Sequence, residues 1–201
     1  MKNILLFLLF VAVSGSACAQ RFEVTAGDIQ RYSKNNFLVT ASEMRAVVPE
    51  STSESVTTNF VYFGPTAQVS HLQNGEVRHQ FGLKLRAQDI CNLVYVMWDF
   101  DSQIIRVSVK LNPGERTSQE CKDHGYHGDF VPVIKEAPPV VKIGASHQLY
   151  AGLAGQTLTV VTDGITVWQG ILPPVVLDLH GPPGIRSDNA QILFDYDTMD
   201  R

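Results

Sequence analysis

Apolar and polar residues alternate strictly in two segments near the middle of the chain. Residues 80–86 (QFGLKLR) and 104–111 (IIRVSVKL) both place apolar side chains at every second position. A period of two is typical of β-strands with one buried face. Between these segments, residues 91–98 (CNLVYVMW) are almost continuously apolar, which predicts a central strand that is covered on both faces.

Further short strand patterns fill much of the chain, and turn residues separate them. Asp163-Gly164 stands between two alternating runs. This dipeptide is a strong signal for a two-residue hairpin with a type I′ turn. The other predicted strands are residues 59–63 (NFVYF), 147–151, 158–162, 165–169 and 191–196.

Helical patterns are scarce. Residues 40–47 (TASEMRAV) predict a short helix, because Thr40 and Glu43 have the spacing of a capping box. The stretch 131–144 (VPVIKEAPPVVKIG) is rich in proline. Proline disfavours regular strand pairing, so we expect an extended connection across the domain there.

Short strands, frequent Gly and Pro turns and little helix predict an all-β fold, an antiparallel two-sheet β-sandwich. Residues 20–201 are long enough for a single β-sandwich domain with its own core. Each sheet of a sandwich has one face in water, which agrees with the alternating strands.

The first residues, 1–19, have the layout of a secretory signal peptide: a lysine, an apolar run and small residues. The run is shorter than the roughly 20 residues that span a bilayer. We expect cleavage before Gln20. The alternative is lipid attachment at Cys18, which would tether the protein to a membrane. Either way the sequence predicts an exported protein, periplasmic or extracellular.

The charge is mildly acidic, with a formal value of −4 that loss of Lys2 with the signal peptide lowers by one. No run of like charges occurs along the chain. Nucleic-acid binding and general attraction to a membrane surface therefore have little support.

Export leaves two cysteines, Cys91 and Cys121, in an oxidising compartment, where an even pair usually forms a disulfide. A zinc site is the alternative, because Cys121, His124 and His127 have the spacing C-x2-H-x2-H and a tetrahedral N/S site could include Cys91. The surrounding polar sequence favours the disulfide.

The segment 181–197 (GPPGIRSDNAQILFDYD) joins turn residues to an alternating run. We expect Gly184 to turn the chain and Arg186 to fix neighbouring loops. Asp188-Asn189 would then form a tight turn, since both residue types tolerate positive φ. The side chains expected to close the core in a final strand are Ile192, Phe194 and Tyr196.

The order of these elements resembles the concanavalin A-like lectin/glucanase superfamily, especially its laminin-G-like jelly rolls. The resemblance covers roughly residues 59–196, as a pattern of strands and turns. It implies a jelly-roll fold, which hosts enzymes, lectins and adhesion modules alike. The positions that carry it are Leu149, Val160, Asp163, Gly164, Trp168, Gly184 and Arg186.

No catalytic motif accompanies the resemblance. The glucanases of the superfamily carry the motif E-x-D-x-x-E on one strand, and this sequence lacks it. Asp99, Asp101 and His124 are the candidates for an unusual polysaccharide hydrolase, and Asp195 and Asp197 form a second acidic pair. We interpret both acidic pairs as solvated strand ends, so a catalytic role is disfavoured and the catalytic set stays empty.

The favoured function is carbohydrate binding without catalysis, with a glycan or cell-envelope polysaccharide as the partner. Sugars are held by aromatic faces and by charged or planar hydrogen-bond donors. Tyr95 and Trp98 point to opposite faces of the same strand, so only one of them can join such a surface. The candidate ligand-binding residues are Lys84, Arg86, Trp98, Arg106 and Lys110, a basic set that suits an anionic glycan.

Two other arrangements stay open. A ligand could instead contact Arg186 and Asp188 at the rim of the sandwich. The protein could also be a structural or interaction component of the cell envelope, lipid-anchored at Cys18. No cofactor is implied by any of these hypotheses, and no metal site is assigned. Calcium held by loop Asp and Asn residues, as in many jelly-roll lectins, has no support from the spacing.

Overall fold

The computed structural model describes residues 21–117, 121 and 132–199. The predicted signal peptide, Cys18, His124 and His127 lie outside these residues. Within them, no helix is long and apolar enough to cross a membrane.

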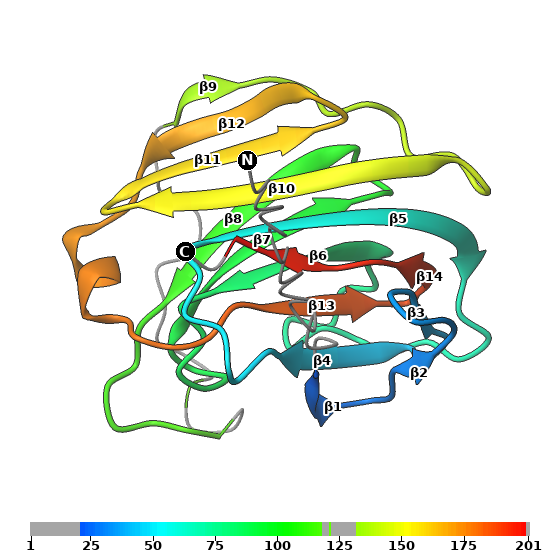
Figure 1. The fold of residues 1–201 in the computed structure, drawn as a ribbon, viewed down its shortest axis with the longest axis horizontal. Helices are drawn as coiled ribbons and strands as arrows, with labels where there is room; N and C mark the ends of the chain where they lie inside the picture. The colour runs from blue at the N-terminus through cyan, green and yellow to red at the C-terminus, as the bar shows by residue number, and fades with distance from the viewer. Residues whose placement is uncertain (1–20, 118–120, 122–131, 200–201) are drawn as a thin grey trace, which may run out of the picture.

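Two antiparallel sheets face each other (Figure 1). Sheet A contains, in spatial order, β1 (Glu23–Ala26), β4 (Glu43–Val47), β13 (Gly184–Asp188), β6 (Gln80–Leu85), β7 (Leu93–Asp99) and β8 (Ile104–Lys110). Sheet B contains β2 (Gln30–Arg31), β3 (Phe37–Val39), β14 (Ala190–Phe194), β5 (Ser55–Pro65), β10 (Ser146–Ala154), β11 (Thr157–Thr162), β12 (Ile165–Ile171) and β9 (Pro132–Lys135), with β15 (Asp197–Thr198) beside β5. The predicted two-sheet sandwich is confirmed.

The core lies between the sheets and is built on aromatic rings. Phe60 of β5 contacts Phe81 of β6 and Trp98 of β7, at centroid distances of 5.0 and 5.7 Å. These contacts cross from one sheet to the other, and all three side chains are buried. The alternating pattern of β6 and β8 therefore sends its apolar half inward, as the sequence predicts.

The predicted helix over residues 40–47 is wrong. Glu43–Val47 is strand β4, which pairs with β1 and β13. Met44 and Ala46 are fully buried in the core, and a period of two places both on the same face. Pairing with two neighbours and core burial outweigh the weak local preference of the capping box.

The prolines after residue 131 do not prevent strand pairing, as the sequence had suggested. Pro132–Lys135 is strand β9, which pairs with β12 at the edge of sheet B. An edge strand accommodates proline at its first residue because the missing N–H does not interrupt a ladder on both sides.

The C-terminal segment contributes one strand to each sheet. The chain leaves β13 in sheet A, turns at Asn189 with φ of 52°, and enters β14 in sheet B. The Asn189 side chain donates to the carbonyl oxygens of Ser70 and Arg78 and accepts from the Ser70 N–H. Asn189, rather than Arg186, fixes the neighbouring loop.

Gly184 also differs from the expectation. It begins strand β13 instead of turning the chain. A Cβ there would lie 2.2 Å from the carbonyl oxygen of Ala46, so glycine is needed for close contact with β4. The expected core residues Ile192, Phe194 and Tyr196 are all buried.

The hairpin between β11 and β12 provides a first prediction. Asp163 and Gly164 have φ values of 49° and 80°, as a type I′ turn requires. Nothing lies within 4 Å of a Cβ added to Gly164, so the cost of a side chain there is conformational. We expect Gly164→Val to lower the free energy of unfolding by about 1–3 kcal/mol, measured by urea denaturation.

Gly164→Asn is the matched control, because asparagine tolerates positive φ far better than a β-branched residue. Its loss of stability should be clearly smaller. Equal losses for the two variants would contradict the conformational explanation.

Candidate functional site

The outer face of sheet A, opposite to the core, gathers basic and aromatic side chains. One row across the strands contains Arg45, Arg186, Gly82, Met97 and Arg106. The adjacent row contains Val47, Gly184, Lys84, Tyr95 and Ser108. Lysine and arginine from four different strands therefore share a single face.

Two glycines lie in these rows where strands approach each other closely. A Cβ at Gly82 would lie 2.1 Å from the carbonyl oxygen of Val96, and Gly184 makes the equally close approach to Ala46. Neither position can hold a side chain without displacing the adjacent strand. Neighbouring side chains cover both glycines, because the Met97 Sδ lies 2.8 Å from the Cβ position of Gly82 and the Val47 Cγ1 lies 3.1 Å from that of Gly184.

A cavity of about 810 Å³ lies over this face. Its floor is formed by side chains of β6, β7, β8 and β13. The loop that contains Leu72 and Arg78 lines one side, and Pro132, Lys135 and Trp168 from β9 and β12 line another. The floor includes Gln80, Tyr95, Arg106, Ser108, Lys110 and Arg186.

Tyr95 lies beneath two cations on this floor. The guanidinium carbon of Arg186 is 4.8 Å from the ring centroid, and the Lys110 Nζ is 5.9 Å from it. Cation–π attraction of this kind contributes about 0.5–2 kcal/mol. The tyrosine ring thus helps to keep two like charges on the same patch.

Asp188 is the buried counter-charge of the patch. Its Oδ1 accepts from Arg45 at 2.6 Å, and its Oδ2 accepts from Arg186 at 2.8 Å and from the Gln80 amide at 2.6 Å. Burial raises the pKa of Asp188, but the charges of Arg186 and Arg45 outweigh burial and leave the pKa below its ordinary value. Asp188 is therefore ionised and saturated with donors.

Lys84 lies on the same face with its side chain almost completely buried, at 2% relative exposure. Burial, with Arg45 and Arg186 nearby, lowers the pKa of Lys84 to about 8. Lys110 responds in the same direction, because burial and the charges of Arg186 and Arg45 lower its pKa as well. Among the described residues, no acidic side chain pairs with either lysine.

Arg106 is held at the far edge of the face by Asp99. Its Nε donates to the Asp99 Oδ2 at 2.8 Å, and the other carboxylate oxygen accepts from the N–H groups of Asp101 and Ser102. Burial raises the pKa of Asp99, but these hydrogen bonds and the Arg106 charge leave the pKa below its usual range. Asp99 therefore positions Arg106 and carries a stable negative charge.

Five predicted residues, from two separate sequence hypotheses, come together in this patch. Lys84, Arg106 and Lys110 were expected on a strand face, and Arg186 and Asp188 at a rim. The structure places all five on the outer face of sheet A. The two alternative sites are parts of one basic face.

Two predicted residues lie elsewhere. Trp98 is fully buried in the core against Phe60, so its ring is not available to stack on a ligand. Arg86 follows the end of β6 with φ of 49°, which turns it away from the strand alternation. Its guanidinium pairs with Glu54 at 2.7 Å and donates to the carbonyl oxygen of Val176.

The candidate acids do not form a catalytic pair. Asp101 accepts from the backbone N–H of His79 and lies 2.9 Å from its Nδ1, while Asp99 holds Arg106. Asp195 accepts from the backbone and side chain of Asn59. His124 lies outside the described residues.

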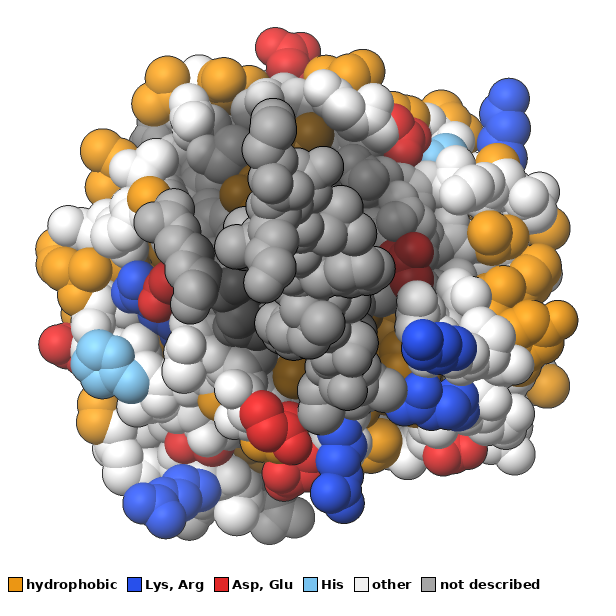
Figure 2. Space-filling view, in the orientation of Figure 1, with side chains coloured by type: hydrophobic (Ala, Val, Ile, Leu, Met, Phe, Trp, Pro, Cys, Tyr) orange, Lys and Arg blue, Asp and Glu red, His pale blue; other side chains and the backbone are white. Residues whose placement is uncertain are grey.

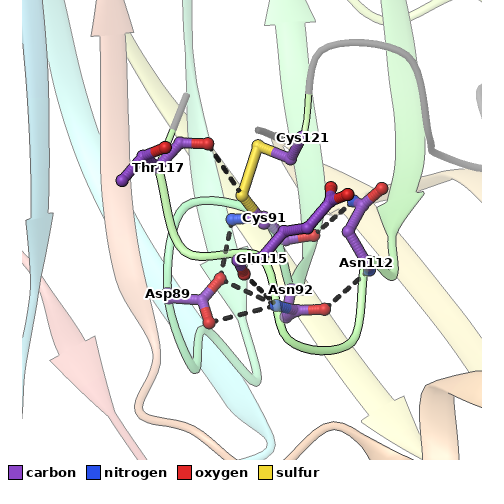
Figure 3. Close-up of a disulfide and its surroundings, with 7 residues drawn as sticks. All are labelled: Asp89, Cys91, Asn92, Asn112, Glu115, Thr117 and Cys121. Atoms are coloured by element: carbon purple, nitrogen blue, oxygen red, sulfur yellow. Dashed lines mark hydrogen bonds between the residues drawn. A yellow bond between two sulfur atoms is a disulfide. The ribbon is translucent and has the colours of Figure 1, made fainter. Parts of the chain in front are cut away.

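Cys91 and Cys121 form a disulfide (Figure 3), as expected from the sequence. Beside it, Asp89 accepts from the Cys91 N–H and from the Asn92 amide, and Asn92 in turn accepts from the Asn112 N–H. Sulfur atoms joined to each other are not thiolate ligands, which removes the zinc alternative that used both cysteines.

Basic side chains of the described residues are scattered on the face shown in Figure 2. Figure 2 shows Lys and Arg in small, separate groups with acidic side chains between them on the face that is viewed. A continuous positive surface would be needed to follow a nucleic-acid backbone. The described residues that are visible on this face form no such surface.

Sequence reasoning missed several residues of the site. Arg45 was missed because its segment was predicted to be a helix. The alternation of Met44 and Ala46 with polar neighbours could have revealed the strand. Gln80 was seen only as a strand position. Lys135 and Trp168 belong to sheet B, and only the three-dimensional arrangement brings them beside sheet A.

Solved structures share this architecture at low sequence identity. The carbohydrate-binding module CBM66 from Bacillus subtilis matches with a TM-score of 0.59 and 10% identity, over 88% of this chain and 95% of that protein. A candidate glycosyl hydrolase from Parabacteroides distasonis matches with a TM-score of 0.51 and 9% identity, over 86% of this chain and 83% of that protein.

The chain shares the fold of these two structures, an antiparallel two-sheet sandwich of the jelly-roll kind. This confirms the fold implied by the resemblance in the sequence. No protein-family model matches the sequence, and no curated protein matches it.

Proposed function

We propose that this chain is an exported, non-catalytic carbohydrate-binding module that holds a glycan in the cavity over sheet A. The observation that carries the proposal is a cavity of about 810 Å³ with polar donors on its floor and aromatic rings among its lining residues. The largely buried rings of Tyr95 and Trp168 add apolar surface to the lining, and Arg106 and Ser108 add hydrogen-bonding groups. Sugars are bound by apolar surface together with polar donors.

The similarity to CBM66 supports the same proposal, because that protein is a carbohydrate-binding module with this fold. A disulfide is typical of proteins in oxidising compartments, and it supports export together with the predicted signal peptide. The partner is a glycan or a cell-envelope polysaccharide. Lipid attachment at Cys18 would add a membrane tether without changing the site.

The acidic residues of the face support binding rather than hydrolysis. Glycosidases of the usual type need one carboxyl group that is protonated at working pH. The two buried carboxylates of the face, Asp99 and Asp188, both have lowered pKa values because arginines pair with them. Neither carboxylate is suited to act as a general acid.

A glycan array with residues 20–201, run with and without calcium, tests the proposal. We expect binding to a restricted set of glycans. Ser108→Tyr should weaken binding at least tenfold, because a ring on β8 would occupy the cavity. The control is Thr157→Tyr, which adds the same ring at an exposed position of β11 in sheet B.

Equal binding by both tyrosine variants would place the glycan outside the cavity and contradict the proposal. Release of shorter sugars from a bound polysaccharide would contradict its non-catalytic part. Absence of binding to any glycan on the array would argue for a structural or interaction role instead.

A further inference from the structure

The charged side chains that line the cavity over sheet A all have the same sign. Five basic residues line it, and no aspartate or glutamate does so among the residues that the structure describes. The whole chain, in contrast, has 20 acidic residues against 16 Lys and Arg. A cleft lined by one sign of charge focuses its potential, so this cavity attracts negative charge on an otherwise acidic protein. The basic residues are Arg78, Arg106, Lys110, Lys135 and Arg186.

The three arginines of the lining have acidic partners that stand outside it. Each carboxylate fixes one guanidinium in place, and none of these acids is itself a lining residue. Glu76 also lies close enough to Arg106 for the two charges to interact. The acids therefore hold the arginines in position without adding a carboxylate to the lining. The pairs are Arg78 with Glu76, Arg106 with Asp99 and Arg186 with Asp188.

The two lysines of the lining have no acidic partner in the described part of the chain. Lys110 is partly exposed, and its Nζ is 5.9 Å from the centroid of the Tyr95 ring. Lys135 is exposed and lies in register with Trp168 between β9 and β12. Lys110 belongs to sheet A and Lys135 to sheet B, so each sheet contributes an ammonium group without a counter-charge.

Arg106 has hydrogen-bond donors that suit an acidic group. Its side chain is 37% exposed, and its Nε is fixed by Asp99 at 2.8 Å. Its Nη2 makes one long hydrogen bond, of 3.4 Å, to Ser102, and its Nη1 makes none to a described residue. The planar fork of the two Nη atoms is therefore available to a ligand. Such a fork binds a carboxylate through two parallel hydrogen bonds, and a sulfate offers the same pair of oxygen acceptors.

We propose that the glycan bound in this cavity is acidic, and that its carboxylate or sulfate groups are bound by Arg106, Lys110 and Lys135. This inference rests on the proposed function and specifies its ligand. Arg106, Ser108 and Lys110 occupy alternate positions on the outer face of β8, with about 13 Å between the first and last Cα atoms. Positive charges that are spread along a strand suit a glycan with several acidic units better than a single acidic sugar.

Matched charged and neutral glycans test the inference by titration calorimetry at pH 7 with residues 20–201. The pairs are oligogalacturonate with its methyl ester, dextran sulfate with dextran, and each acidic glycan selected by the array with its carboxyl-reduced or desulfated form. We expect the charged member of at least one pair to bind at least tenfold more tightly than its neutral partner. The pair that responds distinguishes a carboxylate from a sulfate ligand.

Poly-glutamate is the control for charge alone, because it carries many carboxylates and no sugar. We expect it to bind at least tenfold more weakly than the charged glycan. Equal binding would contradict recognition of an acidic glycan.

Lys110→Gln and Lys135→Gln test the two lysines. Neither side chain has an acidic partner within the described residues, so both variants should fold, which urea denaturation verifies. We expect each variant to bind the charged glycan at least twofold more weakly, and the double variant at least tenfold. The matched control is Lys142→Gln, since Lys142 is exposed between β9 and β10; it should bind as the unmodified protein does.

Arg106→Lys tests the guanidinium. Lysine keeps a positive charge beside Asp99 but removes the planar pair of donors. We expect at least a threefold loss of affinity for the charged glycan. An affinity equal to that of the unmodified protein would exclude Arg106 from the site.

The outcomes separate this inference from the proposed function. If neutral glycans bind as tightly as their charged partners, or if the double lysine variant binds charged glycans unchanged, an acidic ligand in this cavity is excluded while a carbohydrate-binding module remains. If no glycan of either kind binds, the proposed function and this inference both fail.

Discussion

Replacing Asp188 by alanine is expected to lower the free energy of unfolding by about 3–5 kcal/mol, because it leaves buried cations without their partner. Asp188 is 2% exposed and receives hydrogen bonds from Arg45, Arg186 and Gln80. Urea denaturation at pH 7 measures the change. Asp197→Ala, at an exposed position of β15, is the control and should change stability little.

The effect of Asp188 should also depend on pH in a defined direction. Its pKa is lowered in the folded protein, so it contributes stability above its unfolded value of about 4. That contribution is lost as pH falls below 4 through the lowered value. The stability difference between the protein and Asp188→Ala should therefore shrink in acid, and a difference that is constant from pH 7 to pH 2 would contradict this role.

Phe194→Ala is expected to be equally damaging, at about 3–5 kcal/mol, through lost burial and the cavity it leaves. The Phe194 side chain is 1% exposed, and its ring lies 5.5 Å from those of both Phe37 and Phe81. It therefore packs against strands of both sheets. Thermal and urea unfolding give the change in stability.

Leu193→Ala is the comparison for this prediction. Leu193 is the neighbouring residue on β14, but it points to the other face of sheet B and is only partly buried. Leu193→Ala should lower the free energy of unfolding distinctly less than Phe194→Ala does. If the two variants lose the same stability, the final strand does not close the core in the way that its pattern indicates.

The sequence was most informative where local pattern and tertiary burial agree. Strand alternation located β6 and β8, and Asp163-Gly164 located a hairpin, because each signal reflects geometry that the fold keeps. The sequence was misleading over residues 40–47. A capping-box pattern there favours a helix, whereas pairing with β1 and β13 makes the segment a strand. Local residue preferences are too weak to distinguish helix from strand in such a segment when the neighbouring strands are unknown.

The candidate site could likewise be predicted from the sequence only in part. Alternation correctly grouped Lys84 with Arg106 and Lys110, since strands in register share a face. It failed at Arg86, because nothing in the pattern reveals that β6 ends at Leu85. It selected Trp98 for the outer face, where Tyr95 lies instead, because a strand that is apolar on both faces does not show which face is the core. Trp168 joins the cavity only through the packing of one sheet beside the other.

The position of the last two long strands has a consequence for the order of folding. β13 lies between β4 and β6, and β14 lies between β3 and β5. Each sheet is therefore split until residues 184–194 arrive, although every other strand except β15 precedes them in the chain. A chain growing from its N-terminus holds two incomplete halves of each sheet, and long-range pairing of this kind is slow. Neither sheet can therefore be completed before residues 184–194 have been synthesised.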